Sequence, residues 1–321
     1  MVRLIVRSFL SLVIAAIIGS LIVFLLMHFL GGDVVTVILG KEAGPGDVVR
    51  LRHSLGLDRS LPVQYLSWLG GVFTGHLGTS YALGFDIFDQ IQTRFGPTLL
   101  LTFGSLLVSI PLSLSLGTYS AIHVKKWRGG VVDILTQIGI AIPTFWAGLL
   151  LVLFFALKFS VLPTGGYVPF SENPLGSIRS LILPVAALSL GITSVLTRYV
   201  RTAMIDVMSE DFIRAAMAKG RTRRGAALFH GVRNASIPLV TVATLQFGAL
   251  IAGAVVIENV FVIPGIGRML VTATLGREVI VVQSLALVIM MMILVMNFMM
   301  DIAYGFLDPR IRDKQEGRKV A

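Results

Sequence analysis

Six long apolar stretches constrain this chain more than any other feature of its sequence. A helix that crosses a membrane needs about 20 mostly apolar residues, and each stretch meets that length. Soluble domains carry roughly 25% charged residues, whereas this chain of 321 residues carries 14% and has a mean hydropathy of +0.87. The sequence therefore predicts an all-α polytopic membrane protein with six transmembrane helices, near residues 9–30, 97–122, 131–157, 181–200, 237–262 and 281–306.

The first apolar stretch follows Arg3 and Arg7 and could be mistaken for a secretory signal peptide. Its apolar run is longer than a typical signal core, and no clear small-residue cleavage site follows it. We interpret it as an uncleaved first span. The predicted organisation is then an N-terminus and first helix, an outer loop domain, a five-helix core with an internal basic loop at 201–236, and a basic tail, over residues 1–30, 31–95, 96–306 and 307–321.

The distribution of basic residues predicts the orientation, because Lys and Arg accumulate in cytoplasmic segments. With the N-terminus inside, 18 of the 27 Lys and Arg residues fall on the cytoplasmic side. The sequence therefore predicts a multi-pass protein of the bacterial inner membrane with both termini in the cytoplasm. The cytoplasmic set is Arg3, Arg7, Lys125, Lys126, Arg128, Arg198, Arg201, Arg214, Lys219, Arg221, Arg223, Arg224, Arg233, Arg310, Arg312, Lys314, Arg318 and Lys319.

The overall charge and the cysteine content exclude several classes of function. A net charge of +10 would suggest a nucleic-acid partner in a soluble protein, but here it follows from topology, and we expect no nucleic acid to bind. The chain has no cysteine, which excludes disulfides, thiolate metal sites and cysteine nucleophiles. No HExxH, GxSxG or GxxxxGK[ST] motif occurs, so the sequence predicts no catalytic residues, no metal site and no phosphate loop.

Ionisable side chains are almost absent from the predicted spans. Asp133, Asp301, Glu258 and His28 all lie near span ends. A secondary carrier usually needs a carboxylate or histidine relay at depth, so a secondary transporter is disfavoured. The neutral polar residues in the spans either line a pathway or join helices by hydrogen bonds, and both readings stay open. These candidates are Gln137, Thr144, Gln246, Gln283 and Asn297.

Aromatic residues gather in the outer loop, at Tyr65, Trp68 and Tyr81. They suit a small folded cap close to the membrane surface. Such residues also anchor proteins at the interface between membrane and water. Ligand contact and interfacial anchoring both remain open for them.

The internal basic loop contains the pattern of one short helix. Ser209 is the expected N-cap, Glu210 and Asp211 suit the first turn, and Glu210 is expected to pair with Arg214. Gly220 is a good C-terminal stop. Such a helix either lies on anionic lipid headgroups or docks against another protein. Ile237 and Pro238 are expected to open the fifth span, where a proline costs little and fixes the entry angle.

The loop resembles the EAA loop of permease subunits in ATP-binding-cassette importers, and specifically their dipeptide, oligopeptide and nickel branch. The matching residues are DFIRAAMAKG at 211–220, His230, and VRNASIPLV at 232–240. Arg214 stands where the general motif has glutamate, as is usual in this branch. Further similar segments cover nearly the whole chain: LGLDRSLPVQY at 55–65, GHLGTSY at 75–81, LPTGGY at 162–167, ENVFVIPGIGRML at 258–270 and LDPRIR at 307–312.

The resemblance implies a type I importer permease that pairs with a second homologous permease. Two cytoplasmic ATPases would carry the ATP and Mg, so no cofactor is expected in this chain, and an external solute-binding protein would deliver peptides. Ile237 and Pro238 would form the hinge between loop and helix. The residues that would couple to the ATPases are Glu210, Asp211, Phe212, Arg214, Ala215, Ala216, Lys219 and Gly220.

Two departures from the branch pattern concern the outer loop. His76 stands where an aspartate is common, and Gly84, Phe85 and Asp86 replace a usual Pro-Val pair. They leave the class intact but weaken any assignment of cargo. A nickel or metal-chelate permease is the main alternative to a peptide permease, and a secondary transporter or a membrane scaffold is a more distant one.

Overall fold

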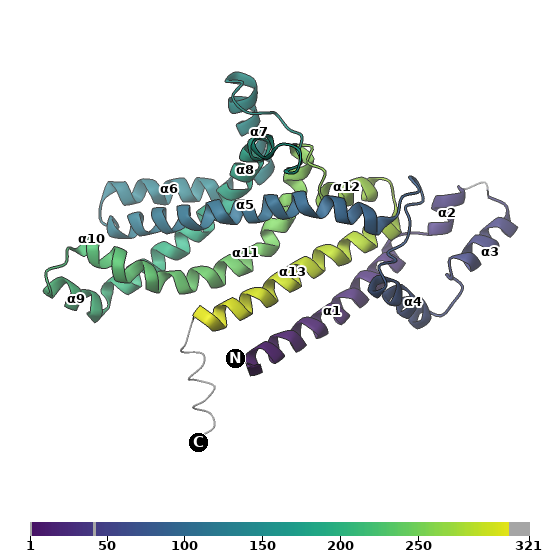
Figure 1. The fold of residues 1–321 in the computed structure, drawn as a ribbon, viewed down its shortest axis with the longest axis horizontal. Coiled ribbons are helices and arrows are strands. Elements are labelled where there is room, and N and C mark those ends of the chain that lie inside the picture. The colour runs from purple at the N-terminus through teal and green to yellow at the C-terminus, as the bar shows by residue number, and fades with distance from the viewer. Residues whose placement is uncertain (1, 41–42, 308–321) are drawn as a thin grey trace, which may run out of the picture.

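The computed structural model describes residues 2–40 and 43–307, and these residues form an elongated assembly of helices (Figure 1). Within these described residues, five helices are long and apolar enough to cross a membrane, and a sixth span is present if one bent pair of helices is counted as a single span. The predicted all-α polytopic fold is confirmed. The long helices are α1 (Val2–Leu30), α5 (Ile87–Ile122), α8 (Pro174–Ser209), α11 (Val232–Val260) and α13 (Val279–Leu307).

The third predicted span is present as a bent pair of helices rather than as one continuous helix. It consists of α6 (Trp127–Ala141), followed by α7 (Thr144–Leu151) and the π-helical segment η1 (Val152–Lys158), and the two halves meet at 103°. Pro143 has no N–H to donate, and its ring drives the preceding residue out of the helical region. Ile142 accordingly has extended backbone angles, φ −74° and ψ 121°. Proline therefore breaks this span.

The core of the bundle is built from α5, α8 and α11, whose large apolar side chains pack together. Leu196, Met204, Phe247 and Leu250 are all almost completely buried. The contact between α5 and α8 is close because small residues line it: a Cβ added to Gly117 would lie 2.7 Å from Val200. Small residues let helix backbones approach each other in membranes. α1 and α13 pack along one another beside this core.

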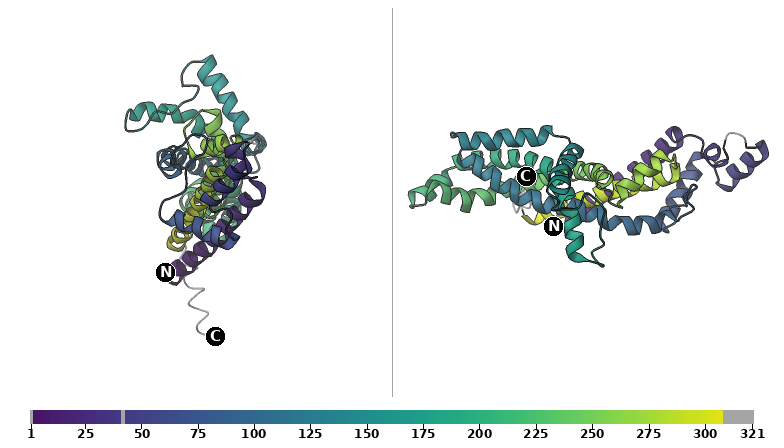
Figure 2. Two further views of the ribbon diagram at one scale, coloured as in Figure 1. Left: turned by 90° about the vertical axis from the view of Figure 1, so that its right-hand side faces the viewer. Right: turned by 90° about the horizontal axis from the view of Figure 1, so that it is seen from above.

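The two ends of the molecule carry different short elements (Figures 1 and 2). One end has α9 (Asp211–Ala218), α10 (Arg223–Ala226) and the π-helical segment η2 (Ala227–Gly231). The other end has α2 (Val34–Leu39), α3 (Pro45–Ser54) and α4 (Leu61–Phe73), and α12 (Ile266–Leu275) lies between α11 and α13. The segments predicted as a basic loop and as an outer loop domain are thus at opposite ends. The basic tail, with the LDPRIR segment from residue 308 on, lies outside the described residues.

Candidate functional site

The basic loop forms the short helix α9 directly after α8, with one extended residue between them. Glu210 has φ −72° and ψ 149° and occupies the N-cap position without a side-chain hydrogen bond. The expected N-cap, Ser209, instead donates its hydroxyl hydrogen to the carbonyl of Asp206 within α8 (2.6 Å). Arg214 pairs with Asp211 instead of the expected Glu210: its Nη1 lies 3.6 Å from Oδ1 of Asp211. The helix was predicted correctly, but its start and its ion pair were each displaced by one residue.

Gly220 terminates α9 as predicted, two residues after the last helical residue, Ala218. Gly220 has φ +89°, and its N–H donates to the carbonyl of Met217 (2.9 Å). The N–H of Arg221 donates to the carbonyl of Ala216 (3.2 Å). This pair of bonds is the Schellman arrangement, which satisfies the free carbonyls at a helix end and favours glycine in the left-handed conformation.

The two faces of α9 differ in burial. Ile213 and Ala216 are buried against Ala226 of α10, where they form a small separate core. The expectation that Ala216 presents a close-contact surface to a partner is therefore wrong, because this side chain packs inside the loop. The exposed outer face of α9 consists of Asp211, Arg214, Ala215 and Ala218. The exposed residues Phe212, Met217 and Lys219 flank that face.

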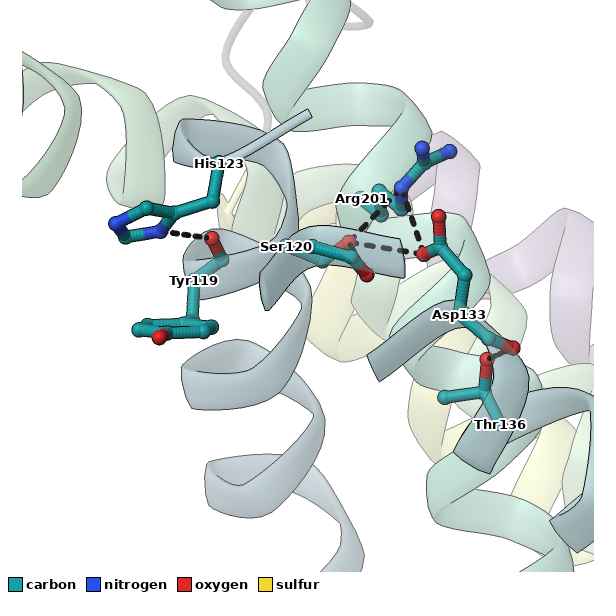
Figure 3. A network of polar contacts seen from close by, with 7 residues as sticks. Tyr119, Ser120, His123, Asp133, Thr136 and Arg201 are labelled. Atoms are coloured by element: carbon teal, nitrogen blue, oxygen red, sulfur yellow. Dashed lines mark hydrogen bonds and ion pairs between the residues drawn. The ribbon is translucent and has the colours of Figure 1, made fainter. Parts of the chain in front are cut away.

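A polar network anchors α8 to its neighbours about three helical turns before α9 (Figure 3). Nε of Arg201 lies 2.9 Å from Oδ1 of Asp133 on α6 and donates to Oγ of Ser120 on α5 (3.0 Å). The Ser120 hydroxyl donates to the same Asp133 oxygen (2.9 Å). Side chains from three helices are therefore joined at one point, and the helix that leads into α9 is tied to the α5–α6 turn.

The sequence placed Arg201 and Asp133 near the same membrane surface but did not pair them. Their opposite charges at neighbouring span ends were the available signal. The partners are 68 residues apart, so their contact depends on how α6 and α8 pack. Gly139 of α6 makes that packing close, because an added Cβ there would lie 2.1 Å from Oγ of Ser194.

The predicted hinge residues Ile237 and Pro238 lie inside α11. This helix begins at Val232, five residues earlier than the predicted start of the fifth span. Pro238 is thus past the first turn, where its missing N–H removes a backbone hydrogen bond from the helix. The expectation that Pro238 lies in the first turn of its helix is therefore corrected to a position further along α11.

The five neutral residues proposed for a pathway are distributed over α6, α7, α11 and α13. Gln137 and Asn297 are exposed, whereas Thr144, Gln246 and Gln283 are partly buried. Gln283 borders a cavity next to Trp68 of α4, so it lies near the α4 end of the molecule. The other four are not assigned to that cavity.

A buried carboxylate, which the sequence had placed only near a span end, lies at the end of α11. Glu258 is fully buried and accepts hydrogen bonds from the Thr98 hydroxyl (2.6 Å) and from the N–H of Arg268 (2.9 Å). Thr98 in turn accepts from the N–H of Ile266 (2.9 Å). A Cβ on Gly265 would lie 2.2 Å from the Glu258 carboxyl carbon. Glu258 therefore fastens α12 to α5 and α11.

Metal ligands do not gather in the described part of the chain. Among residues 2–40 and 43–307, no group of three or more His, Asp or Glu side chains could hold a metal ion.

Two family models match this chain, one over its N-terminal part and one over most of the remainder. Residues 109–313 match the model of the binding-protein-dependent transport system inner membrane component, and residues 1–102 match the model of its N-terminal region. A protein of Brucella abortus (strain 2308) named "Putative peptide transport system permease protein" is 36% identical over 312 residues, which cover 97% of this chain and 99% of that protein. A glutathione transport system permease protein of Salmonella typhi is 35% identical over 314 residues, which cover 98% of this chain and 100% of that protein.

Proposed function

The chain belongs to the family of binding-protein-dependent transport system inner membrane components, and we propose that it is a peptide permease of an ATP-binding-cassette importer. With a second homologous permease it forms the path for short peptides. It is a multi-pass protein of the inner membrane. The names of the two relatives, which match almost the full length of the chain, support a peptide cargo.

One observation carries the proposed coupling to an ATPase: α9 packs on its own loop, and its exposed outer face carries the small residues Ala215 and Ala218 beside the charged Asp211 and Arg214. Ile213 and Ala216 hold α9 in place from its inner side, where they pack against Ala226. Ala215 and Ala218 leave room for a partner surface to approach closely. A helix that served only to lie on lipid would present a continuous apolar face. Here Asp211 and Arg214 place charge on the exposed face, and the most buried apolar residue of α9, Ile213, faces the protein.

Movement of α9 passes to the core through α8. The two helices are continuous apart from Glu210, and Arg201 ties α8 to α5 and α6. When two partner ATPases close on ATP, α9 would shift as a near-rigid body and tilt α8 with its neighbours. Alternating access of the pathway is then a change between two packings of the same helices.

The energy source lies outside this chain. Its sequence has no phosphate loop, so ATP and Mg would be bound by the partner ATPases. The distribution of basic residues supports a cytoplasmic location for both termini and α9, and α2–α4 would then face the external solute-binding protein that delivers cargo.

A nickel or metal-chelate importer is the second candidate, because that branch shares the same loop motif. A chelated metal needs no ligand from the permease, so such an importer is compatible with a chain whose described residues hold no metal-binding group. The names of the relatives above favour peptides.

Reconstitution of the complete importer in proteoliposomes tests this function. With the solute-binding protein present, a labelled dipeptide or glutathione should accumulate only when ATP is hydrolysed, and this chain alone should hydrolyse none. Uptake of chelated nickel without peptide uptake would favour the second candidate. Uptake driven by a proton or sodium gradient without ATP would refute the importer.

A further inference from the structure

A cavity of about 780 Å³ lies at the end of the molecule opposite α9, between the last turns of α1, the start of α13 and the segment α2–α4. The last turn of α1 and the first turn of α13 lie close together here. A Cβ added to Gly31, the residue after α1, would lie 2.7 Å from Cγ1 of Val279, the first residue of α13. The cavity therefore lies where two membrane spans end, at the depth of lipid headgroups. Its volume suits a drug-sized ligand or a headgroup with part of its chains.

The walls of the cavity are divided between apolar and basic groups. Phe24 and Met27 of α1 and Trp68 of α4 form the apolar part, and the rings of Phe24 and Trp68 are 5.9 Å apart. Arg52 and Arg59 supply two guanidinium groups, against one lining carboxylate, Asp33. The cavity thus has excess positive charge beside an apolar surface.

Arg59 is the cation available to a ligand. Arg52 is paired with Asp33 at 2.8 Å. Within the part of the chain that the structure describes, Arg59 forms no ion pair. The neighbouring acid, Asp58, accepts from Nδ1 of His53 at 2.7 Å and does not line the cavity.

The turn that presents Arg59 is held in place by α4. Nε2 of Gln64 donates to the carbonyls of Leu57 (3.2 Å) and Arg59 (2.8 Å). Gly56 has φ +67° in the same turn. This turn belongs to the LGLDRSLPVQY segment, for which the transport mechanism above gives no role. The arrangement fixes the backbone of Arg59 and leaves its guanidinium at the cavity wall.

α4 itself lies against the membrane-spanning part of α1. The hydroxyls of Tyr65 and Ser20 are 2.9 Å apart, and Ser20 is ten residues before the end of α1, or about 15 Å along the helix axis. Outward side chains of α4 are apolar and exposed: Val63, Leu66 and Phe73 have exposed fractions of 45%, 64% and 83%. An apolar helix at this depth with Tyr and Trp on its inner side suits the outer zone of a bilayer.

We propose that this cavity binds the headgroup of an anionic phospholipid. Its phosphate would accept hydrogen bonds from Arg59, and its acyl chains would lie along α4 and α1 beside Phe24, Met27 and Trp68. The cavity matches both parts of such a lipid. The anionic headgroup meets the unpaired guanidinium of Arg59, and the acyl chains meet an apolar wall that continues into the membrane. The proposal depends on the membrane spans and not on which cargo is transported.

Native mass spectrometry of the full chain, released from detergent after exchange into defined lipid, tests the proposal. The wild-type chain should retain phosphatidylglycerol more strongly than phosphatidylcholine with the same acyl chains. Arg59→Gln should weaken phosphatidylglycerol retention about fivefold, from the roughly 1 kcal/mol that one basic side chain contributes at an anionic lipid surface. The matched control is Arg50→Gln, since Arg50 is 80% exposed in α3, pairs with Asp47 and lies outside the cavity; it should behave as wild type.

A second readout locates the lipid. In a Trp127→Phe, Trp146→Phe background, Trp68 is the sole tryptophan. Brominated phosphatidylglycerol should quench the fluorescence of Trp68, and Arg59→Gln should reduce that quenching. This fluorescence also reports whether the Arg59→Gln variant is folded. Equal retention of the two lipids by the wild type, or equal retention by the two Arg variants, would overturn the proposal. Displacement of the lipid by soluble glycerol phosphate or by a dipeptide would overturn it too, and would assign the cavity to a soluble anion.

Discussion

Arg201 of α8 and Asp133 of α6 form an ion pair of 2.9 Å at the end of the bundle that carries α9. Their side chains are 28% and 31% exposed, so the pair is sheltered from solvent on most sides. Ser120 contacts both partners and adds α5 to the junction. The junction therefore joins α8, which leads into α9, to α5 and α6.

Arg201→Met should destabilise the chain and loosen its coupling, because Asp133 keeps a sheltered charge without its partner. We expect a loss of about 1–3 kcal/mol, between the values for exposed and fully buried pairs. Thermal unfolding in detergent measures this, and the ratio of ATP hydrolysed to peptide transported should rise. The control is Arg50→Met, which breaks an exposed pair and should cost less than about 1 kcal/mol. Equal effects of the two variants would contradict this role.

Gly220→Val should disturb the end of α9 without a steric clash. An added Cβ meets nothing within 4 Å, so the penalty arises from the left-handed backbone at φ +89°. That conformation costs roughly 1–2 kcal/mol for an L-residue, and more for a β-branched one. We expect normal membrane insertion with reduced co-purification of the ATPases. Gly130→Ala in α6, where a Cβ also meets nothing, should leave assembly unchanged.

Ala215→Arg and Ala216→Arg should fail in different ways. Ala215 is exposed on the outer face of α9, so its arginine should block ATPase docking while the loop stays folded. Ala216 is buried against Ile213, so its arginine should unfold the loop itself. Limited proteolysis separates the two, because only the Ala216 variant should become sensitive between α8 and α11. If Ala215→Arg assembles and transports normally, α9 does not dock as proposed.

Glu258→Ala should lower stability at the opposite end of the molecule. It leaves the Thr98 hydroxyl and the N–H of Arg268 without their acceptor, and each unsatisfied buried group costs about 1–3 kcal/mol. The expected result is a clear drop in the temperature of unfolding. Glu172→Ala removes an exposed carboxylate and should have almost no effect. Similar unfolding temperatures for the two variants would show that Glu258 does not hold α12.

The orientation of the chain can be tested with single cysteines, since the native sequence has none. Positions 76 and 222 are both exposed and lie in the segments at opposite ends of the bundle. In whole cells, a cysteine at position 76 should react with an impermeant reagent, and one at position 222 should react only after lysis. The reverse pattern would invert the topology.

Local chemistry made several elements predictable from the sequence. The length of the apolar runs determined the number of long helices to within the one broken span. Gly220 ended α9 because glycine alone enters the left-handed region without penalty. The motif residues around α9 and at 258–270 identified the family, which the full-length matches then showed. Each of these signals lies within one short segment of the chain.

Side-chain burial and long-range contacts were decided only by the tertiary structure. The sequence could not tell that Ala216 faces inward while Ala215 faces outward, because both are small and either face of α9 could have packed. Proline alone does not predict a bend, since Pro111 and Pro184 lie inside continuous helices whereas Pro143 follows the end of α6. The pairs Arg201–Asp133 and Thr98–Glu258 join residues 68 and 160 positions apart. Such contacts depend on how helices pack, and packing is a property of the whole bundle rather than of any single segment.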